Sequence, residues 1–137
     1  MEIITKNAQE TQKVGKILAE EIKKGQKVLI IGLEGELGSG KTTFIQGLAR
    51  GLKIKERITS PTFVIMKRYL DYFYHIDCYR LNSPQDLLEL GFREIISQSG
   101  NLVVIEWAEK IKKILPENIL WIKFEYLDKD KRRITTQ

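Results

Sequence analysis

The order of apolar and polar residues along the chain predicts a protein of the α/β class. Two continuous apolar runs, residues 28–33 and residues 102–105, are rich in branched side chains. Such runs are typical of strands that are buried on both faces of a parallel sheet. Other segments repeat apolar residues at intervals of three and four, which is the period of a helix with one buried face. The pattern therefore predicts a mostly parallel central sheet covered by helices.

Two of the predicted helices have a recognisable start. Asn7 and Glu10 have the spacing of a capping box, and a helix is expected from there to about Ile22. Ser83 followed by Pro84 marks another start, because serine suits the N-cap and proline suits the first helical position. Three further helices are expected: one from Lys41 to about Gly51, a short one through Ile95 and Ile96, and one from Ala108 to Leu115.

Two hairpins are expected to add antiparallel strands to the sheet. Residues 62–70 and 72–80 are rich in β-branched and aromatic residues, and little more than Asp71 separates them. Residues 119–126 are expected to form a strand, which a turn at 128–131 connects to a last strand that reaches Arg133 and Ile134.

A glycine-rich stretch follows the first apolar run directly. Gly35, Gly40, Lys41 and Thr42 fulfil the pattern Gly-x-x-x-x-Gly-Lys-Thr of a phosphate-binding loop. Gly38 and Gly40 permit backbone geometry in which successive amides converge on phosphate oxygens. Because a strand precedes the loop and a helix follows it, the context predicts a three-layer sandwich like that of phosphate-loop nucleoside triphosphatases.

The residue types in this loop are suited to a nucleoside triphosphate with its magnesium ion. Lys41 supplies a positive charge for the β- and γ-phosphates, and the hydroxyl of Thr42 can ligate Mg²⁺. The start of the following helix adds the positive end of its dipole. The predicted nucleotide contacts in this stretch are Glu36, Leu37, Gly38, Ser39, Gly40, Lys41, Thr42 and Thr43.

Two acids follow apolar strand residues and are candidates for the chemistry. Asp77 lies between Ile76 and Cys78, where a carboxylate needs a partner, a metal or a hydrogen-bond network. Glu106 ends the run 102–105, at the position that usually holds the magnesium-linked acid of phosphate-loop enzymes. His75 is expected to be a structural histidine.

Size and composition favour one cytoplasmic domain over residues 1–137. The formal net charge of +5 suits a nucleic acid or another anionic partner, and it is also ordinary for a lysine-rich protein. No run of apolar residues is long enough to span a bilayer, and the first residues lack the layout of a secretory signal. The single cysteine, Cys78, is expected to be a core thiol.

Missing motifs narrow the class of nucleotide protein. The Asn-Lys-x-Asp and Asp-x-x-Gly motifs of guanine-specific GTPases do not occur, so ATP is the expected nucleotide. A stand-alone kinase for a nucleoside or other metabolite is the alternative, but no convincing arginine-bearing lid is present. Residues 58–63 are rich in hydroxyls and fixed by Pro61, as a loop that senses the γ-phosphate could be. A nucleotide switch that acts on a partner protein is therefore favoured.

Five blocks in register resemble one family, the bacterial ATPase that supports threonylcarbamoylation of tRNA adenosine 37. They are GELGSGKTTF at 35–44, SPTF at 60–63, HIDCYRL at 75–81, LGF at 90–92 and IEWAE at 105–109. The resemblance covers nearly the whole chain. Two positions depart from the family's pattern: Ser39 replaces a usual alanine, and Ala108 replaces a usual proline.

The resemblance implies roles for individual residues. Lys41 and the loop amides would hold the phosphates of ATP or ADP, while Thr42 and Glu106 would ligate Mg²⁺. Asp77 would act in catalysis or position the attacking water, and the SPTF block would be the switch-like loop. Thr11 and an arginine near the end of the chain, best matched by Arg133, would contact the nucleotide.

The resemblance also implies an accessory function. Family members are weak ATPases alone and act with two sugar-kinase-like proteins, one of which is the catalytic transferase. Nucleotide binding and hydrolysis would reset that complex between turnovers. Contact with tRNA would be weak or indirect.

Overall fold

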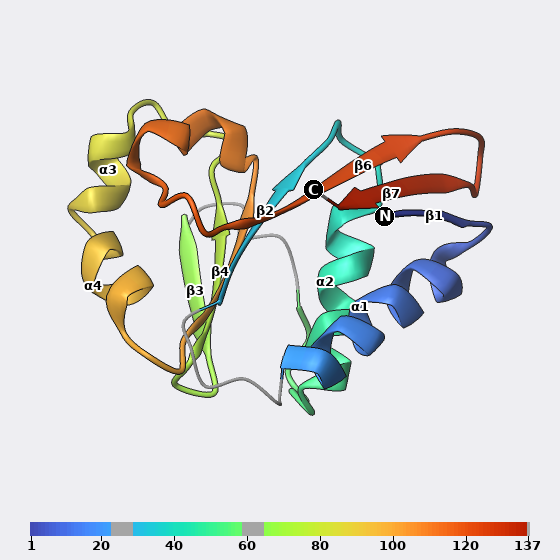
Figure 1. Cartoon of the computed structure of the whole chain (residues 1–137), viewed down its shortest axis with the longest axis horizontal. Helices are drawn as coiled ribbons and strands as arrows, with labels where there is room; N and C mark the ends of the chain where they lie inside the picture. Colours follow the sequence, from blue (N-terminus) through green and yellow to red (C-terminus); the bar gives the residue numbers. More distant parts are fainter. Residues whose placement is uncertain (23–28, 59–64, 137) are drawn as a thin grey trace. The chain divides into compact units, whose positions relative to one another are not determined.

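The computed structural model describes residues 1–22, 29–58 and 65–136. The chain forms two compact units, each of which is described by itself. Unit 1 comprises Met1–Gly25, Gly35–Ser60 and Ile122–Gln137, and unit 2 comprises Gln26–Glu34 and Pro61–Trp121. The described residues form seven strands together with helices (Figure 1). The structure thus has the predicted α/β class.

Unit 1 combines two long helices with a three-stranded antiparallel arrangement. Strand β7 lies between β1 and β6 and pairs with both in antiparallel orientation. The elements are β1 (Glu2–Thr5), α1 (Ala8–Ile22), α2 (Lys41–Gly51), β6 (Leu120–Tyr126, in this unit from Ile122 on) and β7 (Arg132–Thr136). The predicted hairpin at the end of the chain is confirmed.

Helix α1 begins where the capping residues predict. The side chain of Asn7 accepts a hydrogen bond of 2.9 Å from the amide of Glu10. The Glu10 carboxylate in turn accepts one of 2.7 Å from the amide of Lys6. The first bond satisfies an amide that the first turn of a helix cannot pair internally, and the second ties Glu10 to the residue before the cap, so the local sequence fixes the helix start.

Helices α1 and α2 approach each other so closely that their backbones touch. A Cβ atom at Gly15 would lie 2.3 Å from the carbonyl oxygen of Phe44, and one at Gly47 would lie 2.0 Å from that of Gln12. Neither distance is compatible with a side chain, so glycine is required at both positions. On the sheet side, the ring of Phe44 packs edge-on against that of Phe124, with ring centroids 5.3 Å apart.

Unit 2 contains the parallel core of the fold. Strand β5 lies between β2 and β4 and is parallel to both, and β3 joins β4 as an antiparallel hairpin. The elements are β2 (Leu29–Glu34), β3 (Met66–Tyr69), β4 (Phe73–Asp77), α3 (Pro84–Leu88), α4 (Phe92–Ser97), β5 (Leu102–Glu106) and the 3₁₀ helix η1 (Ala108–Ile114). The two strands of the hairpin are shorter than predicted, and residues 62–64 of the first one lie outside the described part.

Helices α3, α4 and η1 cover one face of these strands (Figure 1). Ile30, Ile76 and Ile105 point to this face, where they meet Leu87 of α3 and Phe92 of α4. Full burial of a side chain of this size stabilises the fold by about 1.5–3 kcal/mol. Alternate residues of the same strands, including His75 and Glu106, point to the opposite face.

The segment after β5 is a 3₁₀ helix with a kink, whereas an ordinary helix was expected from Ala108 to Leu115. Trp107 precedes it in the left-handed region, with φ 57°, and the chain departs from helical geometry at Ile111. Among the described residues, no helix combines the length and apolar character needed to cross a membrane.

Candidate functional site

The glycine-rich loop of unit 1 starts directly after the last residue of β2 and ends where α2 begins at Lys41. Gly35, Gly38 and Gly40 all have positive φ, at 147°, 77° and 104°. A Cβ atom at Gly35 would also lie 2.5 Å from the carbonyl oxygen of Phe124. A Cβ atom at Gly38 would meet no other atom. Glycine is favoured there because of the positive φ and not because of crowding. The loop therefore depends on the glycines that the sequence pattern contains.

The N-terminus of α2 is suited to an anion. Gly40 is its N-cap in the left-handed conformation, and neither a side-chain cap nor an acidic residue serves the first turn. The first amides of a helix have no internal partners and lie at the positive end of its dipole. Thr42 and Thr43 lie in this turn and are half-buried. This arrangement is typical of helix starts that bind phosphate.

Ser39 and Lys41 are buried beside this helix start. The Nζ atom of Lys41 donates a hydrogen bond of 2.5 Å to the carbonyl oxygen of Gly35. The hydroxyl of Ser39 is buried and has no hydrogen-bond partner within the described residues. By contrast, Glu36 and Leu37 at the tip of the loop are exposed. A phosphate oxygen would give both the serine hydroxyl and the lysine ammonium a charged partner.

Thr11, which the resemblance predicts to contact the nucleotide, lies next to the loop. Its Cγ2 atom is 3.7 Å from the position of a Cβ atom at Gly40. Its hydroxyl shares a buried hydrogen bond of 2.7 Å with the hydroxyl of Thr5 on β1. This bond fixes the first turn of α1 against the strand, so Thr11 is held in place beside the loop.

The structure brings Arg132, not Arg133, to the loop. The Cγ and Cδ atoms of Arg132 lie 3.5 and 3.8 Å from the position of a Cβ atom at Gly40. Arg133 instead lies 3.5 Å from a carboxylate oxygen of Glu2 and 3.6 Å from one of Glu125. Neighbouring residues of a strand point to opposite faces. Sequence reasoning missed Arg132 because it had no register for β7.

The guanidinium group of Arg132 is held by the turn that precedes β7. Its Nη1 atom donates hydrogen bonds of 3.0 and 2.9 Å to the carbonyl oxygens of Asp128 and Lys131. The guanidinium carbon also lies 4.6 Å from the ring centroid of Tyr126. These contacts are with backbone carbonyl oxygens and an aromatic ring. None of them is with a carboxylate that would neutralise the positive charge of Arg132.

The two candidate acids are neighbours in unit 2. In the register of the parallel strands, Glu106 of β5 lies between Leu33 of β2 and Asp77 of β4. All three residues are at the carboxyl ends of their strands, which is where open α/β sheets bind ligands. The glycine-rich loop continues the chain two residues after Leu33. The register thus places both acids side by side at the carboxyl ends of adjacent strands.

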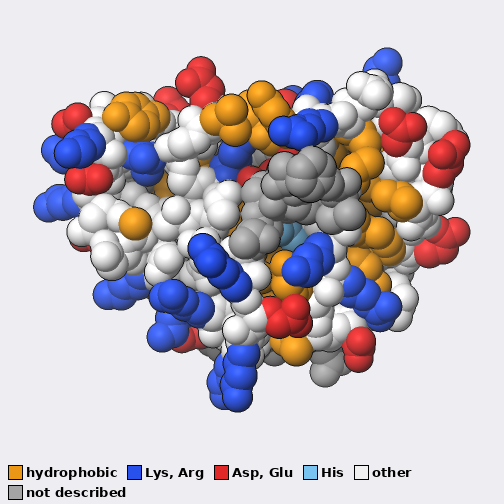
Figure 2. Space-filling view, turned by 180° about the vertical axis from the view of Figure 1, so that it is seen from behind, with side chains coloured by type: hydrophobic (Ala, Val, Ile, Leu, Met, Phe, Trp, Pro, Cys, Tyr) orange, Lys and Arg blue, Asp and Glu red, His pale blue; other side chains and the backbone are white. Residues whose placement is uncertain are grey.

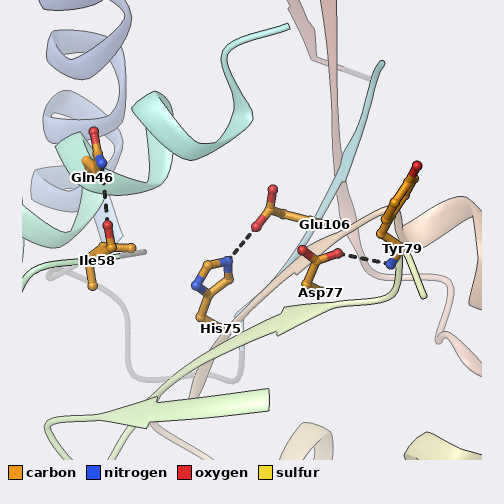
Figure 3. Close-up of polar contacts among 6 residues, drawn as sticks. All are labelled: Gln46, Ile58, His75, Asp77, Tyr79 and Glu106. Carbon is orange, nitrogen blue, oxygen red and sulfur yellow. Dashed lines mark hydrogen bonds and ion pairs between the residues drawn. The ribbon is translucent and has the colours of Figure 1, made fainter. Parts of the chain in front are cut away.

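The two carboxylates are held in different ways (Figure 3). Glu106 is buried, and its Oε2 atom lies 2.7 Å from Nε2 of His75. Asp77 is half-buried and accepts a hydrogen bond of 2.9 Å from the amide of Tyr79, which makes it the cap of a tight turn. The expectation that an acid between Ile76 and Cys78 needs a partner is confirmed.

Aromatic side chains surround the chain segments that leave these strand ends. The rings of Tyr79 and Trp107 lie with centroids 5.0 Å apart. Lys110 donates a hydrogen bond of 2.5 Å to the carbonyl oxygen of Tyr79. These contacts fix the turns that follow both Asp77 and Glu106.

Cys78 is a buried core thiol, as expected. Burial, reinforced by the negative charge of the neighbouring Asp77, raises the pKa of its thiol from 9.0 to about 12. The thiolate is the nucleophilic form of cysteine, so the folded chain does not present Cys78 as a nucleophile near neutral pH.

Each of the two units contains an oxygen group of the kind that binds magnesium. The described residues contain no group of three or more histidines, cysteines or acids that could hold a metal by itself. Magnesium is usually held by one or two protein oxygens together with phosphates and water. Thr42 and Glu106 offer a hydroxyl and a carboxylate of this kind.

One part of the predicted site lies outside the described residues. The SPTF block at 60–63 falls in the segment 59–64. Immediately before it, the carbonyl oxygen of Ile58 accepts a hydrogen bond of 3.4 Å from the side chain of Gln46 on α2 (Figure 3). Helix α2, which follows the glycine-rich loop, is therefore hydrogen-bonded to Ile58, the last described residue before this segment.

The family model that matches this chain and the similar proteins described below all belong to one family. Residues 5–134 match the family described as "Threonylcarbamoyl adenosine biosynthesis protein TsaE". The chain is 38% identical over 137 residues to the tRNA threonylcarbamoyladenosine biosynthesis protein TsaE of Treponema pallidum, covering 98% of both chains. It is 39% identical over 134 residues to the protein of that name in Bacillus subtilis, covering 96% of this chain and 81% of the relative.

A solved structure has the same fold. The crystal structure of the Bacillus subtilis protein YdiB superposes with a TM-score of 0.80 at 35% sequence identity. The match covers 99% of this chain and 83% of the other. The α/β class with a parallel core and added antiparallel strands is thereby confirmed.

Proposed function

Because this chain belongs to the TsaE family of threonylcarbamoyl adenosine biosynthesis proteins, we propose that it is an ATPase that supports threonylcarbamoylation of tRNA. In this role it binds and hydrolyses ATP, and it does not itself make or transfer the threonylcarbamoyl group. It acts as an accessory subunit with two sugar-kinase-like proteins, one of which is the transferase.

The observation that carries the nucleotide part of the proposal is the loop of unit 1. Three glycines with positive φ lead into a helix start that has no side-chain cap and no acid in its first turn. Lys41 and Ser39 are buried beside that start, and the serine hydroxyl has no partner within the described residues. These features together favour a bound triphosphate over a merely tight turn.

Thr42 and Glu106 are proposed to hold the magnesium ion that accompanies ATP. Magnesium would neutralise negative charge on the phosphate oxygens and so favour attack at the γ-phosphate. Thr42 offers its hydroxyl from the first turn of α2, and Glu106 offers a carboxylate at the end of β5. Support for this assignment comes from the oxygen chemistry of both groups and from the family blocks that contain them.

Asp77 is proposed to orient the water that attacks the γ-phosphate. Hydrolysis breaks the bond between the γ-phosphorus and its bridging oxygen, and the water's oxygen replaces it, giving ADP and phosphate. A carboxylate can accept a hydrogen bond from that water and hold it in line. Asp77 is half-buried at a strand end next to Glu106, and Tyr79 fixes its orientation.

Direct recognition of tRNA by this chain is proposed to be weak. Apart from one dense run at 129–133, the basic residues are spread through the sequence, and Figure 2 shows Lys and Arg side chains distributed over one face with acidic side chains among them. Strong binding to a nucleic acid depends on clustered basic residues that replace counterions along the backbone. Partner proteins are therefore proposed to supply most of the contact with tRNA.

ATP turnover in the presence and absence of the two partner proteins tests the proposal. We expect slow release of phosphate from ATP by the chain alone, faster release with both partners, and support of repeated rounds of tRNA modification. Phosphorylation of a small metabolite without partners would instead identify a stand-alone kinase. Unchanged ATP turnover together with unchanged tRNA modification would contradict the accessory role.

A further inference from the structure

We propose that His75 is a positioning residue that holds the Glu106 carboxylate in the orientation used for magnesium. The inference rests on the proposed function, because it concerns the metal that would accompany ATP. It adds a residue that acts through Glu106 and not on the nucleotide itself.

The contact between the two side chains follows from the strand register. His75 of β4 lies beside Val104 of β5, so Glu106 is two residues further along the neighbouring strand and on the same face. Long side chains reach across such a diagonal. The observed distance of 2.7 Å between Nε2 and Oε2 is that of a strong hydrogen bond (Figure 3).

The bond is shielded from water. The side chains of His75 and Glu106 are 0% and 4% exposed. A carboxylate that ligates a metal only accepts hydrogen bonds, so in the proposed site Nε2 of His75 would be the donor to Oε2 of Glu106. In a dry environment this bond is stronger than at the surface, and its loss would leave a buried carboxylate without a side-chain donor from the described part of the chain.

Within the described residues, the bond to Glu106 is also the one hydrogen bond of the imidazole. The second ring nitrogen, Nδ1, is buried and has no partner there. A histidine that only stabilised the sheet would be expected to have both nitrogens satisfied. Among the residues that the structure describes, Glu106 is therefore the one polar partner of the His75 side chain.

The consequence for Glu106 is a fixed carboxylate. The last torsion of a glutamate side chain is broad, so a free carboxylate samples many orientations. The bond to Oε2 selects one orientation and leaves Oε1 to meet a second partner. Hydrogen bonds of this kind to ligating carboxylates typically contribute about 10–100-fold to metal affinity. Asp77 differs, because its bond comes from a backbone amide.

The test compares three His75 variants and one control variant by magnesium titration. His75→Leu removes the donor, His75→Gln retains an N–H at the position of Nε2, and His75→Asn has an N–H too short to reach Glu106. Phe73→Leu is the matched control, because Phe73 is a buried residue of the same strand face. For each folded variant, binding of a fluorescent ATP analogue is measured against magnesium concentration and in EDTA.

We expect His75→Leu and His75→Asn to raise the magnesium midpoint about 10-fold or more. Nucleotide affinity in EDTA should remain that of the wild type, and His75→Gln and Phe73→Leu should have midpoints near the wild type. If His75→Leu does not fold, the comparison of the asparagine and glutamine variants decides, since both carry an amide.

Three results would overturn the inference. They are an unchanged midpoint in His75→Leu or His75→Asn, an equal rise in His75→Gln, or an equal rise in Phe73→Leu. Each would show that the donated bond does not set magnesium affinity. A wild-type chain that binds no nucleotide would instead refute the proposed function itself, and the inference with it.

Discussion

The ammonium group of Lys41 lies 2.5 Å from the carbonyl oxygen of Gly35, so the residue that ends the glycine-rich loop is bonded to the residue that begins it. The loop is thereby closed by its own lysine. A bound triphosphate would offer this ammonium group phosphate oxygens in addition to the carbonyl.

Replacement of Lys41 tests the loop directly. We expect Lys41→Ala to weaken ATP binding by about 10–100-fold, which corresponds to the loss of one charge-assisted hydrogen bond. Isothermal titration with ATP and magnesium measures the effect. Lys13→Ala, at an exposed position on α1, is the control and should bind as the wild type does. Equal affinity in both variants would refute the role of Lys41.

The two neighbouring arginines of β7 provide a second test. The sequence favours Arg133 as a nucleotide contact, whereas the geometry favours Arg132, whose side chain lies against the loop. We expect Arg132→Ala to lower ATP affinity roughly 10-fold and Arg133→Ala to change it little. Binding of a fluorescent ATP analogue to both variants distinguishes them. The opposite order would support Arg133 and contradict the geometric argument.

Glu106 and Asp77 are expected to fail in different ways. Glu106→Ala should weaken nucleotide binding that depends on magnesium and lower turnover. Asp77→Asn should lower turnover mainly, because the amide oxygen can still accept the hydrogen bond from Tyr79 while its neutral charge weakens the hold on water. ATP affinity and phosphate release, measured on the same preparations, separate the two effects. Equal loss of affinity in both variants would overturn this division of roles.

Backbone contact between α1 and α2 predicts a large effect of a small substitution. Gly47→Ala would place a Cβ atom 2.0 Å from the carbonyl oxygen of Gln12. We expect it to lower the free energy of unfolding by about 1–3 kcal/mol, as overpacking typically does. Urea denaturation measures the change. Glu20→Ala, at an exposed position of α1, should stay within about 0.5 kcal/mol of the wild type.

Cys78 gives a prediction that depends on pH. Its pKa is raised from 9.0 to about 12 in the folded chain, chiefly by burial. The unfolded thiol loses its proton first as the pH rises above 9, so the contribution of Cys78 to stability falls between pH 9 and 12. The difference in unfolding free energy between the wild type and Cys78→Ala should shift in that range. At pH 8, a thiol reagent should react with Cys78 only after urea unfolds the chain.

Local sequence was sufficient to predict features that depend on local chemistry. The glycines of the loop, the start of α1 at Asn7 and the hairpin around Asp71 follow from turn and capping preferences, and the structure has all three. The apolar runs likewise identified β2 and β5 as parallel strands. The fold class was therefore predictable without knowledge of any contact.

Features that depend on strand register or on close packing could not be predicted in this way. The sequence alone does not reveal that His75 meets Glu106, or that Arg132 and not Arg133 faces the loop. The required glycines at positions 15 and 47 were equally hidden, because only the approach of the two helices makes them necessary. The left-handed conformation of Trp107 and the kink at Ile111 in the 3₁₀ helix after β5 likewise have no signal in the sequence.

The close approach of α1 and α2 also has a mechanical consequence. Contacts between backbones have no rotamers to exchange, so one helix cannot slide along the other in small steps of side-chain repacking. Thr11 at the start of α1 and Lys41 at the start of α2 therefore keep their spacing when either end is pushed or pulled. The two helices of unit 1 therefore move as one rigid element. A displacement of the exposed side of α1 displaces the first turn of α2 as well.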